Sequence, residues 1–120
     1  MGLKVVGIEG LPEVKRALKQ VESEVRKAAE RAVSDEADAV REDMRATVRA
    51  TAYDTGELHD SIDDEAQGLQ AWIRARARHA NFVEHGTTRM PARPYAQPAF
   101  LVAERRMPKR VGEAVKGAIE

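Results

Sequence analysis

The sequence predicts an α+β fold, in which a long N-terminal helix and a C-terminal helix pack on a small, mostly antiparallel β-sheet. Three observations support this fold class. Apolar residues recur at gaps of three and four over residues 11–48, a period of two runs through residues 71–78, and helical periodicity returns after residue 96. A length of 120 residues is typical of one domain, so we expect residues 1–120 to form a single unit.

The first half of the chain is predicted to hold a strand and a helix. Residues 3–8 (LKVVGI) are β-prone, and we expect them to join the edge of a sheet that is built later in the chain. Pro12 suits the first turn of a helix, because its missing N–H would have no intrahelical partner there. One uninterrupted helix over residues 11–48 is therefore expected, with a bend or break near Ser34 and Asp35 as the alternative.

Residues 53–85 are predicted to form the small sheet. Asp54 or Thr55 could cap a short helical turn that carries Leu58, and Gly68 marks a reversal of the chain. From residue 71 to residue 78, small apolar residues alternate with Trp72 and three arginines, which is the pattern of a half-buried strand. We expect Phe82 and Val83 to be buried just before the chain turns at Gly86.

The last third of the chain is predicted to be a loop followed by a helix. Pro91 and Pro94 lack an amide donor, so residues 86–95 should form an extended loop rather than a central strand. Residues 96–119 regain helical periodicity, and Pro98 is acceptable in the first turn. Pro108 should break or kink this helix, and its end should fray beyond residue 116.

Several classes of function lack support in the residues. Twenty basic and twenty acidic residues cancel, and the absence of cysteine excludes a disulfide framework or a zinc ribbon. His59, His79 and His85 beside Glu84 lack the spacing of metal ligands, and Ser61 lies outside any nucleophile-elbow sequence. No glycine-rich phosphate loop, secretory leader or membrane span is apparent. We therefore expect a protein that is not an enzyme and that uses no cofactor or metal.

Local charge is uneven and offers three interpretations. Residues 49–70 carry one arginine and six acids, whereas residues 71–93 carry five arginines and one acid. The arginines could face the acids within the subunit or in a neighbouring subunit, line a lumen where they touch DNA phosphates, or form a plain solvated face. We favour the first interpretation. The residues concerned are Arg74, Arg76 and Arg78 on one side and Glu57, Asp60, Asp63, Asp64 and Glu65 on the other.

Three runs in fixed order carry a family resemblance: Thr55–Ile62 (TGELHDSI), Asn81–Thr87 (NFVEHGT) and Met90–Ala99 (MPARPYAQPA). With them, and with the start Gly7–Leu11 (GIEGL), nearly the whole chain resembles the phage tail-component proteins related to gene product 10 of phage HK97. The resemblance implies a structural virion protein of the neck or tail-completion region, which forms a ring by self-assembly and joins the head to the tail.

The resemblance also implies partners and a location. The partners would be copies of the chain in a ring and neighbouring head-closure, connector, tail-tube or terminator proteins, while genomic DNA would pass through without sequence-specific binding. The protein would lie in the neck or head-proximal tail of the virion after assembly in the host cytoplasm, without contacting a membrane. The alternative is a small cytoplasmic nucleic-acid-binding or regulatory protein that uses Trp72 and the arginine strand, although single-strand binders usually present several aromatic side chains.

Two sets of residues follow from these interpretations. Glu84 could accept hydrogen bonds from loop amides such as those of Thr87 and Thr88, or it could be exposed without a partner. The residues expected to build the structural motif are Thr55, Gly56, Leu58, Ser61, Ile62, Glu84, Gly86, Pro94 and Pro98. The residues expected to contact a neighbouring subunit or partner ring are Glu57, Asp60, Asp63, Asp64, Arg74, Arg76, Arg78, Thr87, Arg89, Arg93 and Tyr95.

Overall fold

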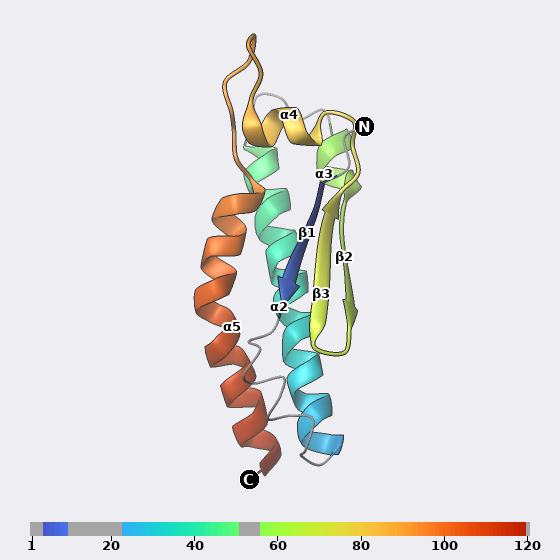
Figure 1. Ribbon diagram of the computed structural model, residues 1–120, viewed down its shortest axis with the longest axis vertical. Coiled ribbons are helices and arrows are strands. Elements are labelled where there is room, and N and C mark those ends of the chain that lie inside the picture. The colour runs from blue at the N-terminus through green and yellow to red at the C-terminus, as the bar shows by residue number, and fades with distance from the viewer. Residues whose placement is uncertain (1–3, 10–22, 51–55, 120) are drawn as a thin grey trace.

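The computed structural model describes residues 4–9, 23–50 and 56–119, and it confirms the predicted α+β class (Figure 1). A long helix, α2 (Ser23–Arg49), lies between a small sheet and a second long helix, α5 (Ala96–Ile119). The molecule is elongated, with extents of 53 × 23 × 21 Å. Helix α2 contacts α5 on one side and strands β2 and β3 on the other. The order across the narrow dimension is therefore α5, α2 and the sheet.

The sheet is antiparallel and has the order β1-β3-β2. Its strands are β1 (Lys4–Glu9), β2 (Ile62–Gln67) and β3 (Gln70–Ala75). The N-terminal strand therefore joins the sheet at an edge, as predicted, and it extends one residue past the predicted end, to residue 9; residue 3, where the predicted strand begins, lies outside the described residues. The expected strand over residues 71–78 is wrong beyond residue 75. Ala75 pairs with Ile62, the first residue of β2, and the chain before Ile62 is helical, so β2 offers no strand partner beyond Ala75.

The reversal between β2 and β3 uses a two-residue turn at Gly68 and Leu69. Gly68 has φ +60°, while no non-glycine residue in the described part of the chain has a positive φ. A positive φ at the first central residue alone is the pattern of a type II′ turn, whose twist matches that of the flanking strands. The predicted reversal at Gly68 is confirmed, and its glycine is required by the backbone.

Helix α2 is continuous through Ser34 and Asp35, so the alternative of a break there is wrong. Residues 11–22, where the predicted helix begins, lie outside the described residues. One stripe of the helix faces the sheet and the other long helix, and five side chains of the predicted apolar stripe are at most 1% exposed. These buried positions, which match the predicted stripe, are Val33, Ala37, Val40, Met44 and Val48.

Two short helices flank the hairpin. In α3 (Glu57–Ser61), Leu58 is fully buried, which confirms the predicted helical turn; the proposed caps Asp54 and Thr55 lie outside the described residues. In α4 (Ala80–His85) the prediction of sheet was wrong, because the helix buries residues at spacings of three and four. Val83 is buried as expected, but Phe82 points away from that face and is 54% exposed.

Helix α5 runs through Pro108 without ending. The expected break is therefore absent, and the helix extends past residue 116 to Ile119. A proline costs the helix one hydrogen bond, but burial on both sides of the proline offsets that loss. The buried side chains there are Ala103, Met107 and Val111, which belong to the same core cluster as the buried stripe of α2.

Candidate assembly surface

The loop between α4 and α5 projects from one end of the long axis (Figure 1). Residues 86–95 form the predicted loop, and a short bridge closes its tip: Thr87 N–H donates to Met90 O at 2.8 Å and Met90 N–H donates to Thr87 O at 3.3 Å. The Arg89 N–H also donates to Thr87 Oγ1 at 3.2 Å. Thr87, Thr88 and Arg89 are exposed, so this tip is available to a partner.

Gly86 starts the loop in a conformation that only glycine adopts easily. It has φ +78°, and a Cβ placed there would lie 2.7 Å from Ala92 N and 3.0 Å from Met90 O. Both contacts are to backbone atoms of the returning arm of the loop, so a side chain cannot be accommodated by a rotamer change. Gly86 therefore allows the two arms of the loop to lie against each other, as expected of a structural motif.

Glu84 fixes the base of the loop, although not through the amides we expected. Its side chain is 3% exposed. Its Oε1 accepts hydrogen bonds from Tyr95 N–H at 3.0 Å and Ala96 N–H at 2.8 Å, and its Oε2 accepts one from Gln97 N–H at 3.2 Å. These are first-turn amides of α5 and the amide before them, which have no partner within the helix. Glu84 is thus a remote N-terminal cap rather than a partner of Thr87 and Thr88.

Tyr95 is part of this anchor and not of the exposed loop. Its side chain is fully buried, and its hydroxyl donates a hydrogen bond to Ala80 O at 3.0 Å. Burial, together with the negative charge of Glu84, raises the pKa of Tyr95. The expectation that Tyr95 contacts another subunit is therefore not compatible with its position. Pro94 and Pro98, expected in the structural motif, are both exposed around this anchor.

The predicted charge pairs on the hairpin form within the subunit. Arg74 Nη1 lies 3.3 Å from Glu65 Oε2, and Arg76 Nε donates to Asp63 Oδ2 at 3.1 Å. Asp63 stands directly opposite Arg74 in the register, so both contacts are diagonal pairs on the outer face of the sheet. Arg78 lies beyond the strand and is exposed.

Asp64 points to the opposite, inner face of the sheet and meets α2. Its side chain is 8% exposed and accepts a hydrogen bond from Arg41 Nη1 at 2.5 Å. A hydrogen bond to the Asp64 carboxyl, burial and the negative charge of Asp64 raise the pKa of Asp38 from 3.8 to about 6. Arg45 donates twice to Ile62 O, at 2.6 and 3.2 Å. These polar contacts join α2 to the start of β2.

Residues of the first structural motif act locally. Gly56 precedes α3 with φ +91°, and a Cβ there would have nothing within 4 Å, so only the backbone conformation requires glycine. Ser61 Oγ donates to Leu58 O at 2.8 Å, and Ile62 is fully buried. The exposed carboxylates of Glu57 and Asp60 lie on the same short helix.

Sequence reasoning missed a buried ion pair between the two long helices. Glu36 is fully buried, and its Oε1 accepts a hydrogen bond from Arg106 Nε at 2.8 Å. Arg110 Nε lies 2.9 Å from Glu36 Oε2, an ion pair without the alignment of a hydrogen bond. Arg106 also donates to Asp43 at 3.0 Å. The only sequence signal was an acid at an apolar position of the α2 stripe, four residues from Ala32 and from Val40.

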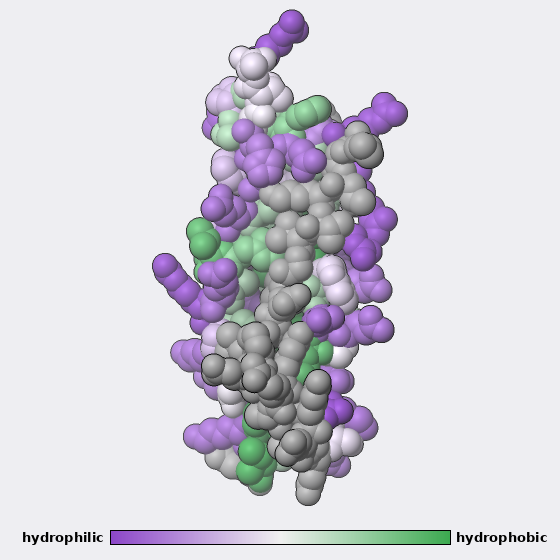
Figure 2. Space-filling view, in the orientation of Figure 1, coloured by the Kyte–Doolittle hydropathy of each residue, from purple (hydrophilic) through white to green (hydrophobic). Residues whose placement is uncertain are grey.

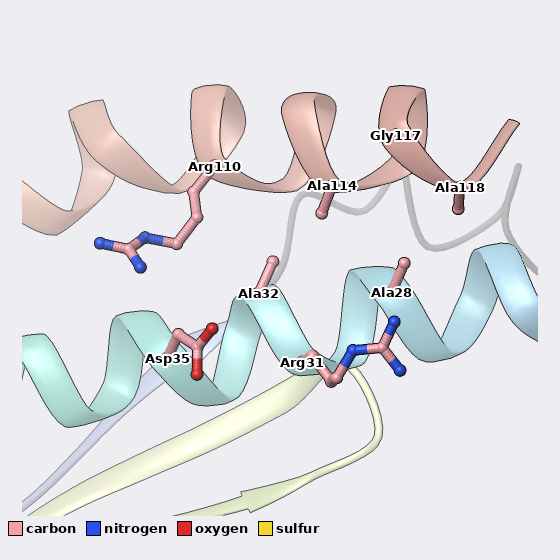
Figure 3. A pocket seen from close by; sticks show the side chains of 8 residues that line it. All are labelled: Ala28, Arg31, Ala32, Asp35, Arg110, Ala114, Gly117 and Ala118. Carbon is pink, nitrogen blue, oxygen red and sulfur yellow. The ribbon is translucent and has the colours of Figure 1, made fainter. Parts of the chain in front are cut away.

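Beyond this ion pair, α2 and α5 leave a groove of about 350 Å³ between them. Figure 3 shows Ala32 and Ala114 pointing toward each other across the gap. Small side chains cannot fill the space between two helices, so the groove follows from the composition of both faces. Its lining residues are Ala28, Arg31, Ala32, Asp35, Arg110, Ala114, Gly117 and Ala118.

The exposed hydrophobic side chains gather on α4 and α5. On the edge of the molecule that α5 forms, Figure 2 shows one hydrophobic patch in the upper part and another at the lower end, with hydrophilic surface between them. Among large apolar residues in the described part of the chain, those with substantial exposure are Phe82 at 54%, Leu101 at 53%, Val102 at 45% and Ile119 at 71%. Leu101 and Val102 are neighbours on the helix side opposite the buried positions, so they form part of an unpartnered face.

Features of other classes of site are sparse within the described ranges. Those ranges hold no cluster of three or more His, Asp or Glu residues suited to a metal ion. His59 Nδ1 lies 2.8 Å from Asp60 Oδ1. His79 lies in the turn before α4, and His85 is the last residue of α4. Within the same ranges, the helices are too short or too polar to cross a bilayer.

The family model described as "Bacteriophage HK97-gp10, putative tail-component" matches residues 13–86, which is more than half of the chain. The chain therefore belongs to this family of phage tail components. No curated protein and no solved structure is significantly similar to it. The matched segment ends at Gly86, so the projecting loop and α5 lie beyond it.

Proposed function

We propose that this tail component joins the phage head to the tail, as a non-enzymatic structural protein of the neck or tail-completion region that forms a ring by self-assembly. Family membership supports a tail protein. The observation that carries the finer proposal is the projecting loop with its buried anchor. The buried side chains of Glu84 and Tyr95 hold the exposed loop in one conformation. A loop that is already ordered in this way is preorganised for binding a partner.

The contacts of the loop would be made by its tip. Thr87 and Arg89 are exposed there, whereas the base is held by three hydrogen bonds to Glu84. Because the conformation is fixed before binding, little entropy is lost when a partner docks. We infer that the tip meets a neighbouring copy or an adjacent head-closure, connector, tail-tube or terminator protein.

DNA would pass through such a ring without sequence-specific binding. Arg74 and Arg76 are paired with acids on the same sheet, so their charge is largely neutralised before any phosphate approaches. This pairing favours a role for Arg74 and Arg76 in fixing strand register and in assembly over a role in binding phosphates. It also counts against nucleic-acid binding by the sheet face that carries Trp72. Arg78, which is exposed, stays a candidate for contact with a neighbouring subunit.

The proposal is tested by disrupting the gene in the phage or prophage that encodes the chain and examining the particles by electron microscopy. We expect DNA-filled heads and separate tails, with infectivity restored when the wild-type chain is supplied. A variant with Thr87, Thr88 and Arg89 replaced by Gly-Ser-Gly should fold normally but fail to restore joined particles. Joined, infectious particles in the absence of the protein would refute the proposed function.

A further inference from the structure

We propose that the ring forms head to tail, with the α5 edge of one copy docking on the α3–β2 edge of the next copy. This inference rests on the proposed self-assembly and specifies the two surfaces involved. The basic edge comprises Leu101, Val102, Arg105 and Lys109 of α5. The acidic edge comprises Glu57, Asp60, Asp63 and Glu65.

The two edges carry opposite charge. Residues 86–119 contain seven basic and two acidic residues, whereas residues 57–67 contain five acidic residues and no lysine or arginine. Arg106, Arg110 and Asp64 are turned to partners within the subunit and do not belong to the two edges. Complementary surfaces of this kind steer association and fix register.

Ion pairs within the subunit show which charges are left for a neighbour. Arg106 and Arg110 are directed to Glu36, while Asp63 and Glu65 pair with the arginines of β3. On the basic edge, Arg105 and Lys109 are exposed one turn apart on α5. On the acidic edge, Glu57 is exposed, and the Asp60 side chain is 80% exposed although its Oδ1 lies 2.8 Å from His59 Nδ1.

The positions of the two edges suit a head-to-tail contact. Figure 1 shows α5 and β2 at opposite long edges of the molecule, with the projecting loop and α3 at the same end. Figure 1 also shows α3 above the first turn of α5, so a rotation about an axis tilted from the long axis is needed to bring Arg105 and Lys109 of one copy to α3 of the next. Every loop then lies on the same side of the ring. Such contacts between unlike surfaces close into a ring when the rotation divides the circle evenly.

The basic edge also has the apolar area that a stable contact needs. Leu101 and Val102 are 53% and 45% exposed and lie within one turn of Arg105. Opposite them, the neighbouring copy would present β2, which is a strand at the edge of its sheet and has an exposed Ala66. A helix laid beside this edge would cover it and prevent unspecific strand pairing.

Charge reversal tests the pairing of the edges. The basic-edge variant is Arg105→Glu with Lys109→Glu, and the acidic-edge variant is Glu57→Lys with Asp60→Lys. The matched control, Lys27→Glu with Arg31→Glu, reverses two exposed charges on α2. Circular dichroism and thermal unfolding verify that all variants fold, and sedimentation velocity measures association.

Each edge variant alone should associate at least about tenfold more weakly than the wild type and the control. A mixture of the two edge variants should recover full-size oligomers, because a reversed basic edge attracts a reversed acidic edge. Raising the salt concentration should weaken association of the wild type and of the mixture alike. Edge variants that associate as well as the control, or a mixture that recovers nothing, would overturn the head-to-tail pairing.

Cross-linking during particle assembly gives a second measurement that does not depend on association in isolation. The chain has no cysteine, so Glu57→Cys with Arg105→Cys introduces unique thiols. A short bismaleimide should give dimers and larger ladders with this double variant but only monomers with either single variant. If joined particles require the protein and yet no ladder forms, the pairing is wrong while the proposed function stands. If particles join without the protein, the proposed function fails.

Discussion

Removing the carboxylate of Glu84 should destabilise the fold, because it leaves backbone amides buried without partners. Glu84 accepts hydrogen bonds from the amides of Tyr95, Ala96 and Gln97, and the first two of these bonds are buried. Each buried amide without a partner costs about 1–2 kcal/mol, and the third can bond to water. We therefore expect Glu84→Ala to lower the free energy of unfolding by about 2–4 kcal/mol, a large share of the roughly 5–15 kcal/mol typical of a domain.

Urea unfolding followed by circular dichroism measures this change. Glu84→Gln should lose only about 1 kcal/mol, because its carbonyl oxygen can still accept from Tyr95 and Ala96. Glu104→Gln, an exposed change on α5, is the control and should lie within about 0.5 kcal/mol of the wild type. Hydrogen exchange should show faster exchange of the Tyr95 and Ala96 amides in the alanine variant. A loss no larger than that of the control would refute the assignment of Glu84 as the cap of α5.

Three further outcomes are expected. Gly86→Ala should lower the thermal midpoint of unfolding more than Gly56→Ala does. Both positions have a positive φ, but only at Gly86 would a Cβ lie 2.7 Å from a backbone atom. Equal decreases in the midpoint would contradict the close contact between the two arms of the loop. Asp38→Asn should stabilise the fold at pH 7 by less than about 1 kcal/mol, since its half-exposed side chain is screened by solvent. Because the pKa of Asp38 is raised from 3.8 to about 6 in the folded protein, the stability that protonated Asp38 contributes at pH 3.5 is lost as the pH rises through 6. In urea unfolding, the extra stability of the Asp38→Asn variant should therefore vanish at pH 3.5. Extra stability that does not change with pH would contradict the raised pKa. Arg106→Ala should cost about 2–4 kcal/mol in urea unfolding because it leaves the buried Glu36 with one cation, and a change below about 0.5 kcal/mol would show that the ion pair is not needed.

The parts of the fold that could be predicted are those with a long periodic signal. The stripe of α2 repeats over many turns, and the alternation around Ile73 places alternate side chains on the two faces of β3. Gly68 identified the hairpin turn because a two-residue reversal needs a positive φ. In each case neighbours in sequence determine the structure, so a single sequence is sufficient.

The parts that could not be predicted depend on partners far along the chain. Helix α4 has six residues, too few for a helical period to be distinguished from a strand. The burial of Glu84 depends on amides 11 to 13 residues away, and Arg106 lies 70 residues from Glu36. A carboxylate on a short segment and an acid within an apolar stripe both look solvated until the packing of α5 is known.

The covering of α2 by α5 has a practical consequence for anyone who works with a shortened form of the protein. A fragment trimmed at residue 86, where the family match stops, would lack Ala103, Met107 and Val111 and would present one apolar side of α2 to water. It would also carry a carboxylate at residue 84 with none of its three amide partners. Such a fragment should aggregate on expression, so the segment that matches the family model is shorter than the length of chain that folds.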